Sequence, residues 1–263
     1  MLERVKKLIL GEEKNPLDPH IFHKLSLIAF LAWVGIGADG ISSACYGPEE
    51  AFLALGNHRF LCIFLALATA GTVFIISLGY SEIIELFPQG GGGYLVTTRL
   101  LGKYPGLLAG SALVVDYVLT ISISIASGGD AFFSFMPADY LPYKFPFQVS
   151  LICLLIYLNL RGAKESIITL LPIFLTFMVT HLVLLVVIFG SHAPVLGSFA
   201  VSQGSQISTE LATVGFLPLF LIFMRAYSMG AGTYTGIEAV SNSMQLLKEP
   251  RVVTGKKTML YMA

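Results

Sequence analysis

Long apolar runs separated by short polar segments dominate this chain of 263 residues. A run of about twenty apolar residues can cross a bilayer as a helix. Because lipid offers no hydrogen-bond partners to the backbone, such runs fold as helices rather than as open strands or loops. Only 12% of the residues are charged, whereas about 25% is usual for a soluble domain. The sequence therefore predicts an all-α integral membrane protein.

The apolar runs predict six membrane spans and the start of a seventh. Residues 1–24 are polar and charged, so we expect a cytosolic tail without a cleaved signal peptide. Residues 25–263 would form one transmembrane domain. Because a new apolar run begins at residue 259 and stops at Ala263, we expect the chain to be the N-terminal part of a longer protein. The six expected spans are 25–55, 60–87, 106–136, 147–160, 167–189 and 216–247.

Lysine and arginine predict how these spans are oriented. If the N terminus is cytoplasmic, thirteen of the sixteen basic residues fall in cytoplasmic segments. Such an excess follows the positive-inside rule for membrane proteins. The other three are Arg59 and Lys144 in the expected outer loops and Arg225 within the sixth span. We therefore expect a multi-pass protein of the cell membrane, with the bilayer as its surroundings.

The first span contains residues that weaken a membrane helix. Near 37–44 it carries Gly37, Asp39 and Gly40, followed by two adjacent serines. Glycine costs a helix about 1 kcal/mol relative to alanine, and a carboxylate at bilayer depth costs roughly 2.5–3.5 kcal/mol or more. We therefore expect the helix to be broken here, with Asp39 facing a polar site. Capping of the second half-helix by this carboxylate is the structural alternative.

The sixth span is interrupted in a similar way, at 228–236, where Gly230 and Gly232 would supply the opened backbone. Five spans separate the start of one interrupted segment from the start of the other. Because this number is odd, the second half of the fold would have the opposite orientation in the membrane to the first half. Two interrupted segments at corresponding places in two halves are typical of a transporter's binding site.

Acidic and hydroxyl side chains at membrane depth are the candidate ligands. Asp116 lies in the third span, and Thr120 and Ser124 follow it at four-residue spacing on one helix face. Glu238 begins the second half of the sixth span, where capping of a helix N-terminus is its structural alternative. Buried acids in membrane spans are rare and usually functional.

An oxygen-rich, negative site favours a small cation or an amine. Hard cations prefer oxygen ligands, whereas the carboxylate of an amino acid would be repelled by Asp39 unless that group were protonated or screened. The chain has no net charge, which argues against a nucleic-acid partner. It shows no metal-ligand spacing and no activated nucleophile, so we expect a transporter that needs no cofactor and not an enzyme. A membrane sensor or a membrane-embedded enzyme is the alternative from another class.

Several motifs resemble the amino acid–polyamine–organocation (APC) superfamily. Within it, the KimA-type potassium importers are most similar. The resemblance covers roughly 25–260, and its motifs are specific as a set. They are Ala38-Asp-Gly-Ile-Ser-Ser-Ala-Cys-Tyr-Gly47, Gly91-Gly-Gly-Tyr94, Asp116-Tyr-Val-Leu-Thr120 and Thr235-Gly-Ile-Glu-Ala-Val-Ser-Asn242.

The resemblance implies a LeuT-type fold, of which this chain would hold the first five-helix repeat and the broken first helix of the second. It also implies proton-coupled potassium uptake, with potassium and protons as the transported ions. A homodimer would form through a C-terminal part that this chain lacks. The implied site comprises Asp39, Tyr46, Asp116, Thr120, Ser124, Thr235 and Glu238. An amino acid or polyamine permease of the same fold remains the second hypothesis.

Overall fold

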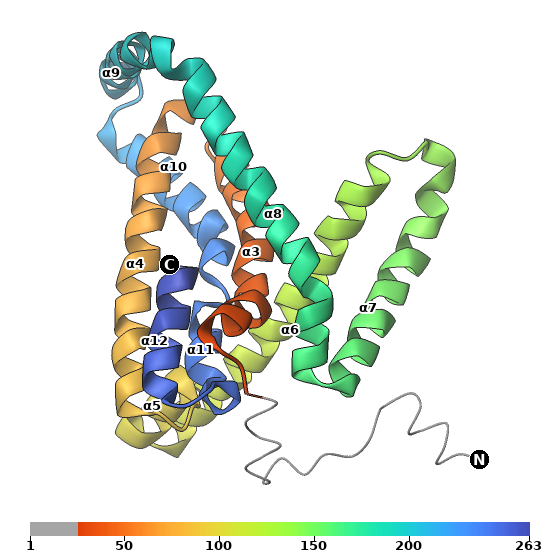
Figure 1. Cartoon of the computed structure of the whole chain (residues 1–263). Helices are drawn as coiled ribbons and strands as arrows, with labels where there is room; N and C mark the ends of the chain where they lie inside the picture. Colours follow the sequence, from red (N-terminus) through yellow and green to blue (C-terminus); the bar gives the residue numbers. More distant parts are fainter. Residues whose placement is uncertain (1–25) are drawn as a thin grey trace, which may run out of the picture. The chain divides into compact units, whose positions relative to one another are not determined.

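The computed structural model describes residues 26–263, so the tail expected at 1–24 lies outside the described part of the chain. Within the described residues the structure is helical and contains no β-strand beyond one isolated bridge, between Leu27 and Leu247. Figure 1 labels the α-helices, which are α3 (Ala29–Ala54), α4 (Cys62–Leu86), α5 (Gly92–Leu101), α6 (Lys103–Phe133), α7 (Lys144–Arg161), α8 (Ala163–His192), α9 (Leu196–Thr213), α10 (Phe216–Met229), α11 (Ile237–Asn242) and α12 (Arg251–Met262).

Five helical segments of the described chain are long and apolar enough to cross a membrane. Most of their large apolar side chains are exposed on the protein surface, as lipid-facing side chains would be. Helix α3, the expected first span, is not among these five segments. It is long enough, but it carries the acids Asp39, Glu49 and Glu50. The five segments are Arg59–Leu86, Lys103–Phe133, Ala138–Leu160, Ser166–Val195 and Phe216–Asn242.

The break expected near 37–44 is absent, because α3 is one continuous helix of 26 residues. This prediction was wrong. The Ser42 hydroxyl donates to the Asp39 carbonyl at 2.8 Å, and the Ser43 hydroxyl donates to the same carbonyl at 3.0 Å. These bonds span three and four residues, which is the pattern of serine inside a helix. The two serines therefore lie inside the helix, bonded to its own backbone, and do not cap a second half of it.

Glycines in α3 provide close packing instead of unwinding. Neither Gly37 nor Gly40, the two expected to open the backbone, has a positive φ. A Cβ added to Gly35 would lie 2.5 Å from Ile167 Cγ1 of α8, so this glycine lets α8 approach α3 closely. Small residues at a helix surface commonly serve this purpose in membrane proteins.

The interruption expected in the sixth span is present. Helix α10 ends at Met229, a 3₁₀ segment covers Gly230–Tyr234, and α11 begins at Ile237. Gly236 has a φ of 89°, a left-handed conformation that glycine adopts without strain. The expected Gly230 and Gly232 both lie in the 3₁₀ segment.

Two further segments deserve comparison with the sequence. Residues 191–213 lie between the fifth and sixth expected spans and are rich in serine, glycine and threonine, yet they contain helix α9 (Leu196–Thr213). The element expected to begin at residue 259 begins at Arg251, as α12. Propensity undervalued both segments, because a helix can form from polar residues when its surroundings support it.

The chain divides into two compact units. The first comprises Met1–Ser43, Ile76–Leu171 and Thr235–Ala263, and the second comprises Ala44–Ile75 and Pro172–Tyr234. The boundaries after Ser43 and after Tyr234 fall in or beside the two stretches that the sequence predicted to be interrupted.

The second unit has a buried apolar cluster formed by Ala51, Leu55, Leu65 and Ala226. A Cβ added to Gly230 would lie 2.8 Å from Ala51 Cβ, so this glycine lets the end of α10 approach α3. In the first unit α5 packs on α6, and α11 packs on α5 and α12.

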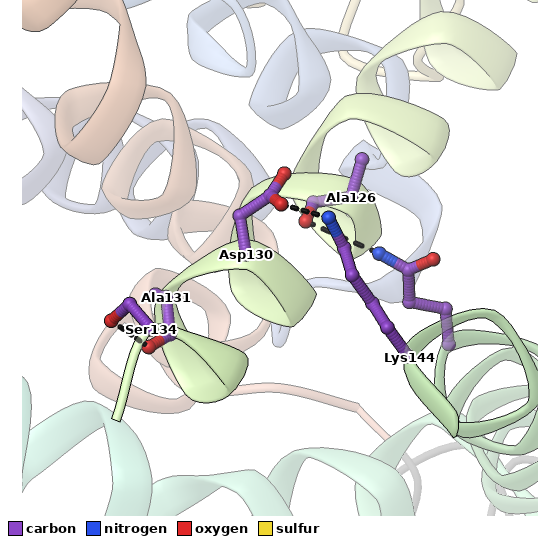
Figure 2. A network of polar contacts seen from close by, with 6 residues as sticks. Ala126, Asp130, Ala131, Ser134 and Lys144 are labelled. Atoms are coloured by element: carbon purple, nitrogen blue, oxygen red, sulfur yellow. Dashed lines mark hydrogen bonds and ion pairs between the residues drawn. The ribbon is translucent and has the colours of Figure 1, made fainter. Parts of the chain in front are cut away.

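Helices α6 and α7 form a hairpin in the first unit (Figure 1). Figure 2 shows Lys144 of α7 paired with Asp130 of α6, and Gln148 Nε2 donates to the Ala126 carbonyl at 3.3 Å. The Phe147 and Phe132 rings stack with centroids 4.8 Å apart. The ends of the two helices are thus held by an ion pair and by aromatic packing.

Backbone bonds fix the start of α3 in the same unit. Leu27 donates to the Leu246 carbonyl and accepts from the Lys248 amide, both at 2.8 Å. Lys256 of α12 pairs with Glu85 of α4. These contacts hold the chain entering α3 beside the chain that follows α11.

Candidate ion-binding site

Three carboxyl groups from three helices of the first unit interact electrostatically with one another. Asp39 comes from α3, Asp116 from α6 and Glu238 from α11. The structure therefore brings together the three acids that the sequence singled out, although they are 77 and 122 residues apart along the chain.

Hydroxyl groups connect the same three elements. Ser124 of α6 donates to the Ser42 hydroxyl of α3 at 3.1 Å. Ser43 is hydrogen-bonded to the hydroxyl of Thr235, in the turn that precedes α11. Thr120 is buried, with 8% of its surface exposed. Expected residues Thr120, Ser124 and Thr235 thus belong to the same unit as the carboxyls.

A close backbone approach places Asp39 beside this turn. A Cβ added to Gly236 would lie 2.9 Å from the Gly40 amide nitrogen and 3.1 Å from Asp39 Cγ. Glycine is therefore required at position 236 both for its left-handed conformation and for the absence of a side chain. The close approach of Gly236 to Asp39 also brings the neighbouring Thr235 and the start of α11, which contains Glu238, toward Asp39.

Two carboxylate oxygens of this cluster are buried without a partner. Among the described atoms, Asp39 Oδ1 and Glu238 Oε1 are shielded from solvent and accept no hydrogen bond. A buried acceptor that is left unsatisfied costs about 1–3 kcal/mol, and more when it is charged. Such atoms in a native structure call for an explanation, and the binding of a cation is one.

Other polar residues of this region were missed as ligands by the sequence reasoning. Tyr117 follows Asp116 and interacts electrostatically with all three carboxyls, and Asn242 Nδ2 donates to its hydroxyl at 2.9 Å. Tyr80 of α4 interacts electrostatically with Glu238. The resemblance motif that ends at Asn242 contained this residue, but nothing in the sequence paired it with Tyr117.

Tyr46 belongs to the second unit, unlike the other six expected ligands. There it lies beside Gly232, whose added Cβ would be 3.4 Å from Tyr46 Cε2. The same unit contains a close approach of Gly47 to Thr233. It also contains a hydrogen bond of 2.5 Å between the hydroxyls of Thr72 and Tyr227. The participation of Tyr46 in the site stays a prediction.

The arrangement suits binding rather than catalysis. Three acids surrounded by hydroxyls offer oxygen ligands and negative charge to a cation. Within residues 26–263 no group of three or more His, Cys, Asp and Glu side chains is arranged to hold a metal ion. A site for a weakly bound monovalent cation differs from such a cluster, because hydroxyl and carbonyl oxygens supply much of its coordination.

Comparison with known proteins agrees with a transporter. The profile of the amino acid permease family matches residues 25–263. The potassium transporter KimA of Bacillus subtilis (strain 168) is 34% identical over 273 aligned positions, which include all of this chain and 42% of KimA. The chain thus spans about two fifths of the length of this relative.

A match over nearly the whole chain establishes the family, and the family is one of transporters and not of enzymes. Membership also implies the LeuT-type fold, in agreement with the helical structure and the interrupted segment between α10 and α11. This chain therefore belongs to the amino acid permease (APC) family of membrane transporters.

Proposed function

We propose that this protein is a secondary transporter that takes up potassium together with protons. The observation that carries the proposal is the pair of buried, unpartnered carboxylate oxygens, Asp39 Oδ1 and Glu238 Oε1, in a cluster with Asp116. A monovalent cation would satisfy these oxygens and offset the negative charge of the cluster. Residues Asp39, Asp116 and Glu238 hold the ion or the coupled proton in this proposal.

Hydroxyl oxygens complete the proposed coordination. Thr120, Ser124 and Thr235 lie in the same unit as the acids, and the Ser42 and Ser43 hydroxyls link α3 to two of them. Neutral oxygen ligands suit potassium, which must lose its hydration shell and yet leave again.

Proton coupling follows from the number of acids. In a cluster of three carboxyls one group can carry a proton while the others face a cation, because both offset the negative charge of the cluster. Release of the proton and the potassium ion on the same side of the membrane would then complete one cycle of symport. The name of the relative, a potassium transporter, supports the same substrate for this chain.

Transport of an amino acid or a polyamine is the second candidate, favoured by the description of the family as amino acid permeases. The three acids favour the amine of a polyamine over the carboxylate of an amino acid. An amino acid would need its carboxylate received by free amides at the interrupted helix, close to Glu238.

Rubidium uptake tests the proposal. The full-length protein is produced in a bacterial strain that lacks its own potassium uptake systems, and entry of radioactive rubidium is measured. We expect uptake that an imposed proton gradient accelerates, and growth at low potassium. Growth rescued only by an amino acid or a polyamine would reject the potassium proposal.

The variant Asp39→Asn tests the site itself. Losing one charge-assisted contact, worth about 1.5–3 kcal/mol, reduces affinity by roughly tenfold or more. We therefore expect the apparent KM for rubidium to rise at least tenfold. Asp139→Asn, an exposed acid in the 3₁₀ segment Ala138–Tyr143, is the matched control and should transport like the wild type.

A further inference from the structure

Asn242, the last residue of α11, is linked to the carboxyl cluster through Tyr117. Its Nδ2 donates to the Tyr117 hydroxyl oxygen at 2.9 Å. Because that oxygen accepts a hydrogen bond, the phenolic hydrogen remains available for donation to another group. Asn242 follows Glu238 by four residues, one helical turn, so the two share a face of α11. Tyr117, bound to Asn242 and next to Asp116 in α6, therefore lies on the side of the carboxyl cluster, with whose three members it also interacts electrostatically.

One hydrogen-bond acceptor of the Asn242 side chain is not used within the described part of the chain. Among the described atoms its Oδ1 is buried and has no hydrogen-bond partner. Neighbouring Ser241, which is 1% exposed, donates to the Glu238 carbonyl at 2.7 Å. The Ser241 bond lies within α11, and the side chain of Asn242 joins the end of this helix to Tyr117 of α6.

The glycine turn before α5 leaves room for the end of α11. Gly90 and Gly92 have φ values of 90° and 44°. A Cβ added to Gly92 would overlap Asn242 Oδ1 and lie 2.6 Å from Ser241 Oγ, and one added to Gly90 would lie 3.1 Å from the Asn242 carbonyl oxygen. A side chain in this turn would displace Asn242.

We propose that Asn242 is a positioning residue of the cation site, which orients the Tyr117 hydroxyl toward the carboxyl cluster, and that the Gly90–Gly92 turn provides the room for it. This inference rests on the proposed function. Asn242 does not touch the ion. In the proposal its amide uses the acceptor side of the Tyr117 oxygen, so that the phenolic hydrogen can be donated to a carboxylate when the cation binds.

A double-mutant cycle on the full-length protein tests the link. Rubidium KM and maximal rate are measured for Asn242→Ala, Tyr117→Phe and the double variant. Since both single variants remove the same oriented hydrogen bond to a charged group, we expect each to raise KM by about tenfold, with a smaller change in maximal rate. The double variant should be no worse than either single variant. Effects on KM that multiply would overturn the proposal.

The variant Gly92→Ala probes the same position without altering Asn242 or Tyr117. We expect a rise in rubidium KM similar to that of Asn242→Ala, because the new methyl group displaces the amide. Gly56→Ala is the matched control: Gly56 has a φ of 56°, and its added Cβ would meet nothing within 4 Å. The control shares the backbone strain but should keep the wild-type KM. Equal KM values for Gly92→Ala and Gly56→Ala would overturn the proposal.

The outcomes separate this inference from the function on which it rests. Absence of rubidium uptake by the wild type would reject both. Uptake by the wild type with unchanged KM in Asn242→Ala and Tyr117→Phe would reject only the positioning role. If Asn242→Ala accumulates poorly in the membrane, Asn242→Ser retains a short polar side chain and is measured in the same cycle.

Discussion

Ser43 is a residue whose hydroxyl contributes to two structures at once. It donates to the Asp39 carbonyl within α3 and is hydrogen-bonded to the Thr235 hydroxyl, while none of its surface is exposed. The same serine therefore keeps α3 helical and holds the turn before α11 against it. In a low-dielectric interior such small polar networks rigidify their neighbours when every member is satisfied.

Replacing Ser43 by alanine should destabilise the protein. The substitution removes the hydrogen bond between the fully buried Ser43 and Thr235, and such a bond contributes about 0.5–1.5 kcal/mol. We expect the melting temperature of the detergent-solubilised protein to fall by several degrees. Ser122→Ala is the control, because the exposed Ser122 hydroxyl only donates to the Val118 carbonyl of its own helix. A melting temperature shared by both variants would contradict the role of Ser43.

At the scale of elements, the interrupted segment between α10 and α11 depends on Gly236. This glycine combines a left-handed backbone with a close approach to Gly40 of α3. The approach lets a broken element lie against a continuous one and brings Glu238 toward Asp39. Only a residue without a side chain satisfies both requirements.

The variant Gly236→Ala should therefore destabilise the protein more than alanine at another glycine with a left-handed backbone. Gly215 has a φ of 88°, and the nearest atom to its added Cβ is Pro218 Cδ at 3.9 Å. Both alanines would carry the strain of a left-handed residue, about 1–2 kcal/mol. Gly236→Ala would add an overpacking cost of roughly 1–3 kcal/mol. Thermal unfolding of the two variants measures the difference, and equal losses would contradict the packing argument.

At the scale of the whole molecule, the division of the chain into two compact units falls within α3 and before the turn that leads into α11. One boundary follows Ser43 and the other follows Tyr234. Residues adjacent in sequence, such as Ser43 and Ala44, thus belong to different units. The acids of the proposed site all belong to the first unit, and Tyr46 belongs to the second.

The predicted orientation is testable with single cysteines. In a protein whose Cys45, Cys62 and Cys153 are replaced by alanine, we expect Asp139→Cys to react with a membrane-impermeant maleimide on intact cells. Lys248→Cys should react only after the cells are permeabilised, because the basic segments are predicted to be cytoplasmic. Both positions are exposed. Labelling of Lys248→Cys on intact cells would contradict a cytoplasmic N terminus.

The sequence by itself determined the helical membrane class, the positions of most helices, the interruption after Met229 and the three acids of the cluster. These features depend on local quantities: apolar run length, the conformational freedom of glycine and the high cost of a charge in lipid. The tertiary structure decided what the glycines of α3 do. A glycine can unwind a helix or let another segment approach, and only the atoms that pack against it determine which.

The same reason explains why Asn242 and Ser43 needed the structure. Each acts through a partner more than a hundred residues away, Tyr117 for one and Thr235 for the other, and sequence spacing carries no record of such pairs. Hydropathy shows where a polar side chain raises the free energy of a membrane segment. Only the fold shows which neighbouring elements supply the hydrogen-bond partners that offset this cost.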